Sequence, residues 1–273
     1  MNKTVIASLL AASTLLTGCV VVAKTHQANF HQQKTLTIQA NNLNELVIDA
    51  GAGSLKVIGS KDQTNIMVTA DIYTDENRPN AFDLSLEKSG IHAELVAKNH
   101  NTSGFWKGSS PRIDLLVSLP NGVKLAIDDG SGVIEVTGMN SAIDIKDGSG
   151  DIYIDQGRDM LNIEDGSGSI YVKSFDGDSE IEDGSGSIEL NNLHGNLVLD
   201  DGSGSVNIQQ VTGNVTINDG SGELRVEDVS GVVSIDDGSG GITVQNAGGL
   251  KITEAGSGSL KFNNIKGKVE VDS

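Results

Sequence analysis

The chain has 273 residues, a formal net charge of −18 at neutral pH, 34 glycines and only 3% aromatic residues. So few aromatics argue against a conventional globular core, and the negative charge disfavours binding to nucleic acid or to anionic lipid headgroups. The imbalance lies in one half of the chain, because residues 127–273 contain 27 acidic and eight basic residues, whereas residues 19–126 contain ten of each. The second half is therefore compatible with divalent cations or a basic partner.

Residues 1–18 predict a bacterial lipoprotein signal peptide. Lys3 supplies a positive charge, a short apolar stretch follows, and Leu16-Thr17-Gly18-Cys19 resembles a lipobox around the only cysteine. That resemblance implies cleavage before Cys19 and its lipidation (diacylglyceryl and acyl chains such as palmitate), which anchors the chain stably in a membrane. Because Val20, not aspartate, follows the cysteine, the outer membrane is favoured over the inner membrane. Apart from the signal peptide, no apolar run approaches 18 residues, so no transmembrane helix is expected.

Residues 19–34 are expected to form a tether, and residues 35–122 an irregular N-terminal β region. Residues 46–59 resemble, in degenerate form, the repeats of the second half, so we expect the solenoid to begin near Leu46. Longer strands within residues 60–111 are expected to be either extended rungs or an antiparallel flap that caps the first coil.

A polar loop at residues 99–111 contains Phe105 and Trp106, the only tryptophan. Exposed aromatics on such a loop form a candidate contact site. The alternative is that they fold back onto the neighbouring sheet.

Residues 123–273 are expected to form a regular solenoid. Apolar-x-apolar triplets, such as Ile188/Leu190 and Leu197/Leu199, start nine residues apart and predict short strands with one buried face. Recurrent corner glycines disfavour helix. The word Asp-Gly-Ser-Gly returns every 18 residues, which predicts an all-β fold, a single-stranded parallel β-solenoid (β-helix) with 18-residue coils. The words begin at Asp129, Asp147, Asp165, Asp183, Asp201, Asp219 and Asp237, and the eighth copy begins at Ala255.

We call the seven aspartates that begin these words the aspartate column. If the coils stack, its members lie about 4.8 Å apart, and like charges at that distance repel by about 1 kcal/mol in water and several-fold more near a protein surface. The column must therefore be well solvated, partly protonated, or bridged by weakly bound divalent cations. A purely structural role is the main alternative, because aspartate before glycine makes an Asx turn. The half-coil length of nine residues matches a calcium-binding nonapeptide, but this repeat has an apolar residue where that motif has its ligand aspartate, so a calcium site of that type is not expected.

A strand ending in Leu119-Pro120-Asn121-Gly122-Val123, then Leu125-x-Ile127 and the Gly-Ser-Gly repeat, is similar to the putative adhesin family of bacterial β-solenoid domains of unknown function. The resemblance extends from Leu36 to the C-terminus. It implies a β-solenoid and a role in attachment, and it assigns no catalytic residues. The regularity of Asp-Gly-Ser-Gly departs from the usual family pattern.

Two other surface features stand out. Tyr153 and Tyr171 are one repeat apart and are expected to stack across neighbouring rungs, with a carbohydrate platform as an alternative role. Lysines gather in the last coils, where they are expected to protect an open sheet edge or, alternatively, to dock an acidic partner. They are Lys251, Lys261, Lys266 and Lys268.

No catalytic motif, cofactor motif or metal cluster is found in the sequence, and the five histidines are scattered. We therefore expect a non-enzymatic, adhesin-like interaction or structural module of the cell envelope, with an unknown protein or glycan partner. One alternative is a polysaccharide-acting β-helix enzyme whose groove comes from residues 60–111. Another is a cation-responsive envelope sensor that uses the aspartate column. The handedness, the cross-section, oligomerisation through the C-terminal edge and the exposed face of the membrane stay open.

Overall fold

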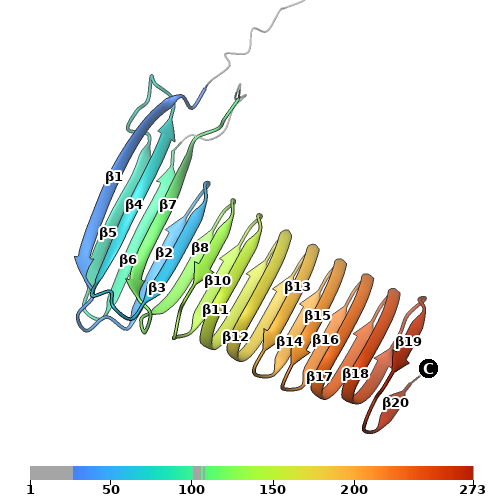
Figure 1. Ribbon diagram of the computed structural model, residues 1–273. Helices are drawn as coiled ribbons and strands as arrows, with labels where there is room; N and C mark the ends of the chain where they lie inside the picture. The colour runs from blue at the N-terminus through green and yellow to red at the C-terminus, as the bar shows by residue number, and fades with distance from the viewer. Residues whose placement is uncertain (1–26, 101–105, 107, 273) are drawn as a thin grey trace, which may run out of the picture.

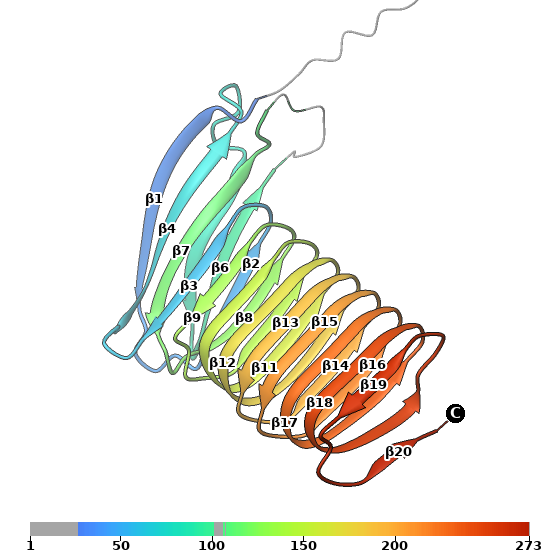
Figure 2. The ribbon, with the colours of Figure 1, turned by 45° about the vertical axis from the view of Figure 1, so that its right-hand side comes forward.

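The computed structural model describes residues 27–100, 106 and 108–272, and this part of the chain consists of β-strands and turns without a helix. The strands form a parallel β-solenoid of about eight turns, which confirms the fold predicted from the repeat. Figures 1 and 2 show a flat rod with one strand of each coil on either side. We call the two sides face A and face B.

Face A consists of twelve strands in the order in which they lie along the rod. They are β1 (Phe30–Gln39), β4 (Asn65–Thr74), β7 (Arg112–Pro120), β3 (Leu55–Ser60), β9 (Ile134–Thr137), the first halves of β11 (Ile152–Asp165) and β12 (Gly168–Asp183), β13 (Gly186–Leu193), β15 (Gly204–Val211), the first halves of β17 (Gly222–Asp237) and β18 (Gly240–Glu254), and β19 (Leu260–Asn263).

Face B is built in the same way from the other strand of each coil. Its strands are β5 (Phe82–Ser89), β6 (His92–Asn99), β2 (Glu45–Ala50), β8 (Lys124–Asp129), β10 (Ile143–Asp147), the second halves of β11 and β12, β14 (Leu197–Asp201), β16 (Val215–Asp219), the second halves of β17 and β18, and β20 (Val269–Val271).

Each regular coil pairs with the next at a register of 18 residues, so that chemically equivalent residues stack. Ile188 lies opposite Val206, and Leu197 lies opposite Val215. The apolar residues of both strands point inward and form one continuous core from Ala40 to Ile252. Burying a side chain of this size stabilises a fold by about 1.5–3 kcal/mol, and each coil receives this only by stacking on its neighbours.

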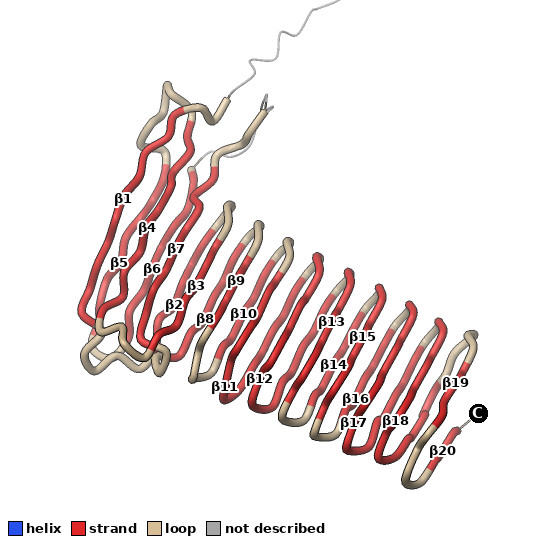
Figure 3. Tube along the Cα trace, in the orientation of Figure 1, coloured by secondary structure: helices blue, strands red, loops and turns tan. Residues whose placement is uncertain are grey.

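The N-terminal region combines the two arrangements that the sequence left open. Strands β6 and β7 form a long parallel rung, while β1, β4 and β5 add antiparallel strands at the end of the rod (Figure 3). The coil β2–β3 lies between the rung β6–β7 and the coil β8–β9. The chain therefore passes over its first coil, and the order of rungs along the rod differs from their order in the sequence.

One boundary expected from the sequence is wrong. Strand β1 begins at Phe30, inside the range 19–34 that was expected to be a tether. The reason is backbone pairing, since residues 30–34 lie antiparallel to residues 70–74 of β4. Residues 19–26 of the expected tether lie outside the described residues. Residues 27–29 are described and lead directly into β1.

Candidate functional site

The aspartate column lies inside the rod, at the corner where face B turns towards face A. Its members continue the inward alternation of the face B strands, so each follows a buried isoleucine or leucine by two residues. Their exposed fractions are only 1–6%. Successive aspartates are paired across the sheet, as Asp147 with Asp165 and Asp183 with Asp201. Because the carboxyl groups are buried, solvation by water does not relieve the repulsion between them. Protonation and bound cations are the two explanations that remain.

One oxygen of these carboxyl groups serves the turn that follows. The Oδ1 atom of Asp183 accepts a hydrogen bond of 3.0 Å from the backbone N–H of Ser185, and equivalent bonds occur at Asp165, Asp201 and Asp237. This is the Asx turn expected from the sequence. The second glycine of the word is required by packing, because a Cβ at Gly186 would lie 1.5 Å from the carbonyl oxygen of Gly168 in the adjacent coil.

The other carboxyl oxygen has no partner at any of the seven positions. Each Oδ2 is buried and makes no hydrogen bond to a protein group. The column is followed by an alanine at each end. Before Asp129, the equivalent position is Ala50 on β2, which pairs in turn with Ala97 on β6. Beyond Asp237, Glu254 pairs with Asp236, and Ala255 is the next residue of the chain. The carboxyl groups thus face mainly one another, which is a costly arrangement for buried charges.

Burial raises the pKa values of the whole column. The pKa of Asp129 rises to about 7, with a further contribution from the charge of Asp147. Burial is also the main cause at Asp165 and Asp237, whose pKa values are raised as well. For the remaining members, burial raises the pKa to about 6, against the opposing backbone hydrogen bonds of the turn, and these are Asp147, Asp183, Asp201 and Asp219.

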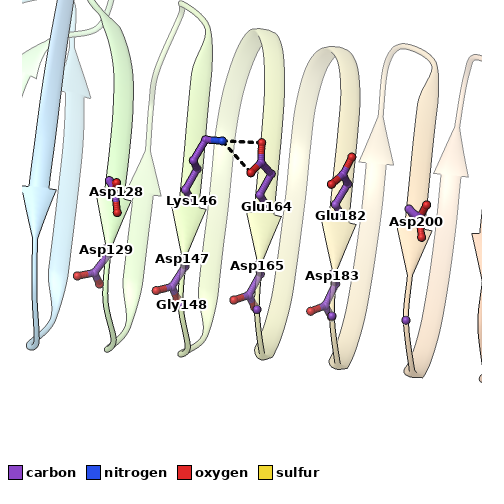
Figure 4. A pocket seen from close by; sticks show the side chains of 13 residues that line it. Asp128, Asp129, Lys146, Asp147, Gly148, Glu164, Asp165, Glu182, Asp183 and Asp200 are labelled. Atoms are coloured by element: carbon purple, nitrogen blue, oxygen red, sulfur yellow. Dashed lines mark hydrogen bonds and ion pairs between the residues drawn. The ribbon is translucent and has the colours of Figure 1, made fainter.

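A shallow acidic groove of about 740 Å³ runs along the outside of the same corner (Figure 4). Its outer wall is the outward-facing column of face B, and its floor belongs to the aspartate column. The only basic residue in the lining is Lys146, whose Nζ lies 2.8 and 2.7 Å from the two carboxylate oxygens of Glu164. This ion pair raises the pKa of Lys146. Because Glu164 neutralises the lysine, the groove stays strongly negative.

The two tyrosines stack as predicted. The rings of Tyr153 and Tyr171 lie 4.7 Å apart between centroids and are inclined by only 4°. With Thr137, Asp155 and Lys173 they line a shallow cavity of about 350 Å³ on face A, which we call the tyrosine ledge. An aromatic pair beside hydrogen-bonding side chains offers a ligand both apolar and polar contacts.

The expected contact loop is only partly described, since Phe105 lies outside the described residues. The expected lipidation site, Cys19, also lies outside them. Trp106 is half-buried and lies against the N-terminal cap, near Arg78 and His100, beside a cavity of about 10 Å³. This placement is compatible with folding back onto the neighbouring strands, and a contact role of the loop stays a prediction.

The C-terminal coil presents an incomplete core. Phe262, Val269 and Val271 continue the inward columns of β18 but are 41–45% exposed, because no described strand packs beyond them. Lys268 forms an ion pair with Glu270, which lowers the pKa of that glutamate. Lys261 and Lys266 lie on the same terminal coil, as expected for the lysine cluster.

Sequence reasoning missed one periodic feature, a second column of turns at the opposite corner. The residues there adopt the left-handed conformation, with φ between 54° and 72°, although most are not glycine. They are Gly138, Gln156, Ser174, Asn192, Gln210, Asp228, Asn246 and Asn264. Their common 18-residue spacing was visible in the sequence, but only half of the column, Asn192, Asp228, Asn246 and Asn264, has the asparagine or aspartate that usually marks this conformation.

Among the described residues, no group of three or more His, Cys, Asp or Glu side chains is placed to hold a metal ion. No helix in that part of the chain is long and apolar enough to cross a membrane.

No family model matches the chain, and no curated protein does. Solved structures are similar to it over most of its length. One is named a putative adhesin from Bacteroides fragilis, with 15% identity, a TM-score of 0.48, and coverage of 87% of this chain and 99% of that one. Another is a putative adhesin from Parabacteroides merdae, with 11% identity, a TM-score of 0.40, and coverage of 88% and 100%.

A third is a putative cell adhesion protein from Clostridium sporogenes, with 14% identity, a TM-score of 0.31, and coverage of 88% and 100%. At such identities and TM-scores these likenesses carry no argument about what the present chain binds.

Proposed function

We propose that this chain is a lipid-anchored, non-enzymatic β-solenoid rod of the outer membrane that serves as an interaction or structural module of the cell envelope. The observation that carries the proposal is the direction of the rod. The capped end contains the first described residues, which follow the expected lipidation site at Cys19 in the sequence, and the regular coils extend away from this end towards the C-terminus (Figure 1).

The dimensions support a role as a spacer with exposed faces. Twelve strands at about 4.8 Å give face A a length of roughly 50 Å along the rod. A single core runs through this length, so the rod is stiff and holds its surface at a fixed distance from the anchor. The tyrosine ledge on face A supplies the contact surface, because it joins stacked aromatic rings to Asp155 and Lys173.

The enzyme alternative required a cleft built by residues 60–111. The described part of that segment forms the antiparallel strands β4 and β5 and the strand β6 of the parallel rung, and the cavity beside Arg78 and His100 measures about 10 Å³. A space of this size holds at most about one water molecule and leaves no room for a sugar ring. The geometry therefore favours a binding module over a polysaccharide-acting enzyme.

The anchor is tested by replacing Cys19 with serine in the full-length protein expressed in its own host. We expect the wild-type protein to incorporate labelled palmitate and to sediment with outer-membrane vesicles, and the Cys19→Ser protein to do neither. Palmitate labelling of Cys19→Ser at the wild-type level would contradict the anchor.

The contact surface is tested with purified envelope glycans. Tyr153→Ser and Tyr171→Ser are expected to weaken glycan binding at least tenfold, whereas Thr243→Ser, in the same outward column but far along the rod, leaves it unchanged. Equal binding by all variants refutes the ledge as the glycan contact. Release of new reducing ends from the glycans would identify an enzyme instead.

A further inference from the structure

The orphan oxygens of the aspartate column need a binding partner that the proposed function does not supply. Seven carboxyl groups are 94–99% buried, and each uses at most one oxygen for the Asx turn. In Figure 4 the carboxyl groups of Asp129, Asp147, Asp165 and Asp183 point in the same direction, as a row along the rod. Buried polar atoms are almost always hydrogen-bonded, so seven unpartnered Oδ2 atoms in one row are a strong sign of a missing ligand.

We propose that the aspartate column is a proton-binding site, in which a protonated carboxyl group of one coil donates a hydrogen bond to the carboxylate of the next. The ligand is the proton itself. Each shared proton gives an orphan Oδ2 a hydrogen-bond partner in the neighbouring coil and removes one negative charge from between two paired strands. This goes beyond a role as a rod, because it makes the stability of the rod respond to pH.

The spacing of the coils suits such bonds. Paired strands are about 4.8 Å apart, and the two oxygens of one carboxyl group are about 2.2 Å apart. Carboxyl groups aligned with the rod axis thus leave about 2.6 Å between oxygens of neighbouring coils. Hydrogen bonds from a hydroxyl to a carboxylate are typically about 2.5–2.7 Å long.

The surroundings provide no other neutralising charge. The column is packed against apolar core residues on its inner side, and its end neighbours are Ala50 and Ala255. The one nearby lysine of the groove, Lys146, is already held by Glu164. Lys98 lies on β6, two strands before the start of the column on β8, and is paired with Asp49. The other charged groups that face the column from its own and neighbouring strands are all acidic: Asp128, Asp151, Glu182, Asp200, Asp236 and Glu254.

The direction of the pH effect follows from linkage. In the folded chain, five members of the column have pKa values raised from 3.8 to about 6–7, and those of the other two are raised as well, so the folded chain binds more protons than the unfolded chain as neutral pH is approached. The stability contributed by these protons is complete below the unfolded pKa and is lost as the pH rises through 6–7. For each proton retained only by the folded state, the unfolding equilibrium constant rises tenfold per pH unit between the unfolded pKa of 3.8 and the folded pKa of about 6–7, and it levels off above that range.

The test uses the full-length protein in a neutral detergent, with urea unfolding followed by circular dichroism between pH 5 and 8.5. We expect the unfolding midpoint to fall as the pH rises, and the infrared carbonyl band of protonated carboxyl groups to be present at pH 6 and absent at pH 8.5. Asp183→Asn carries an amide N–H in place of the shared proton, so it should raise the midpoint at pH 8.5 and flatten the profile. The matched control is Asp200→Asn, the exposed neighbour of the column, which should keep the wild-type slope.

Two results would overturn the proposal. The first is a midpoint independent of pH together with no protonated carboxyl band at pH 6. The second is stabilisation of the wild-type protein at pH 8.5 by millimolar calcium or magnesium, reversed by a chelator and absent in Asp183→Asn, since the column would then be a cation site.

Discussion

A buried pair of unequal size offers the sharpest test of how the coils pack. Phe175 is fully buried, and its partner in the adjacent coil is Gly157. A Cβ built on Gly157 would lie 2.4 Å from Cε2 and 2.5 Å from Cδ2 of the Phe175 ring. The phenylalanine therefore fills the space that the missing side chain leaves, and the two positions must be considered as one packing unit.

The magnitudes follow from this geometry. Phe175→Ala removes a fully buried ring and should lower the free energy of unfolding by about 3–5 kcal/mol. Gly157→Ala forces a methyl group against the ring and should cost about 1–3 kcal/mol by overpacking. In the double variant the methyl group has no ring to strike and fills part of the cavity. The combined loss should therefore be smaller than the sum of the single losses by about 1–3 kcal/mol.

The assay is a double-mutant cycle, measured by urea unfolding with far-ultraviolet circular dichroism as the signal. A control cycle pairs Gly157→Ala with Val211→Ala, which lies in the same inward column but two coils away from Phe175. That cycle should be additive within about 0.5 kcal/mol. Additivity in the Phe175 cycle as well would refute the compensation between the two residues.

Two further substitutions test the corners. Gly186→Ala places a Cβ 1.5 Å from a backbone oxygen of the adjacent coil and should cost at least about 3 kcal/mol in urea unfolding, whereas Ser185→Ala, one residue before, should change it by less than about 0.5 kcal/mol. A small loss for Gly186→Ala would mean that the corners do not stack in register. Gln210 has a φ of 60°, so Gln210→Gly should raise the free energy of unfolding by about 0.5 kcal/mol. Gln209 precedes it in β15 and does not have a positive φ, so Gln209→Gly should lower the free energy of unfolding. A gain at both positions would contradict the strained-turn explanation.

The regular half of the fold was predictable because one coil repeats in the sequence with a constant length. Alternating triplets such as Ile188/Leu190 show which side chains point inward, and the 18-residue step aligns each with its copy in the next coil. Even the deviation before Ala255 was visible, since Leu250 comes one residue early and pairs with Val233 after a register shift. Local signals of this kind persist because each coil contacts only its neighbours.

The N-terminal region was predictable only in part, since its contacts join distant segments. The strands themselves were recognisable, but nothing local shows that β2–β3 lies between β6–β7 and β8–β9, or that Phe30 begins a strand. Some pairing partners there are far apart in the sequence, as Leu46 with Ala93 (47 residues) and Leu55 with Leu115 (60 residues), and their choice depends on competition between strands with similar apolar patterns.

By itself, the sequence determined the parallel solenoid, the inward residues, the stacking of Tyr153 on Tyr171 and the alignment of the aspartates. Only the tertiary structure decided that those aspartates are buried and that more than half of their oxygens have no hydrogen-bond partner among the described residues. The physical reason is that a periodic sequence specifies which residues are equivalent, whereas the depth of a corner residue depends on how both faces close around it. The same alternation that places isoleucine in the core carries on for one more inward position, and there the chain has a carboxyl group.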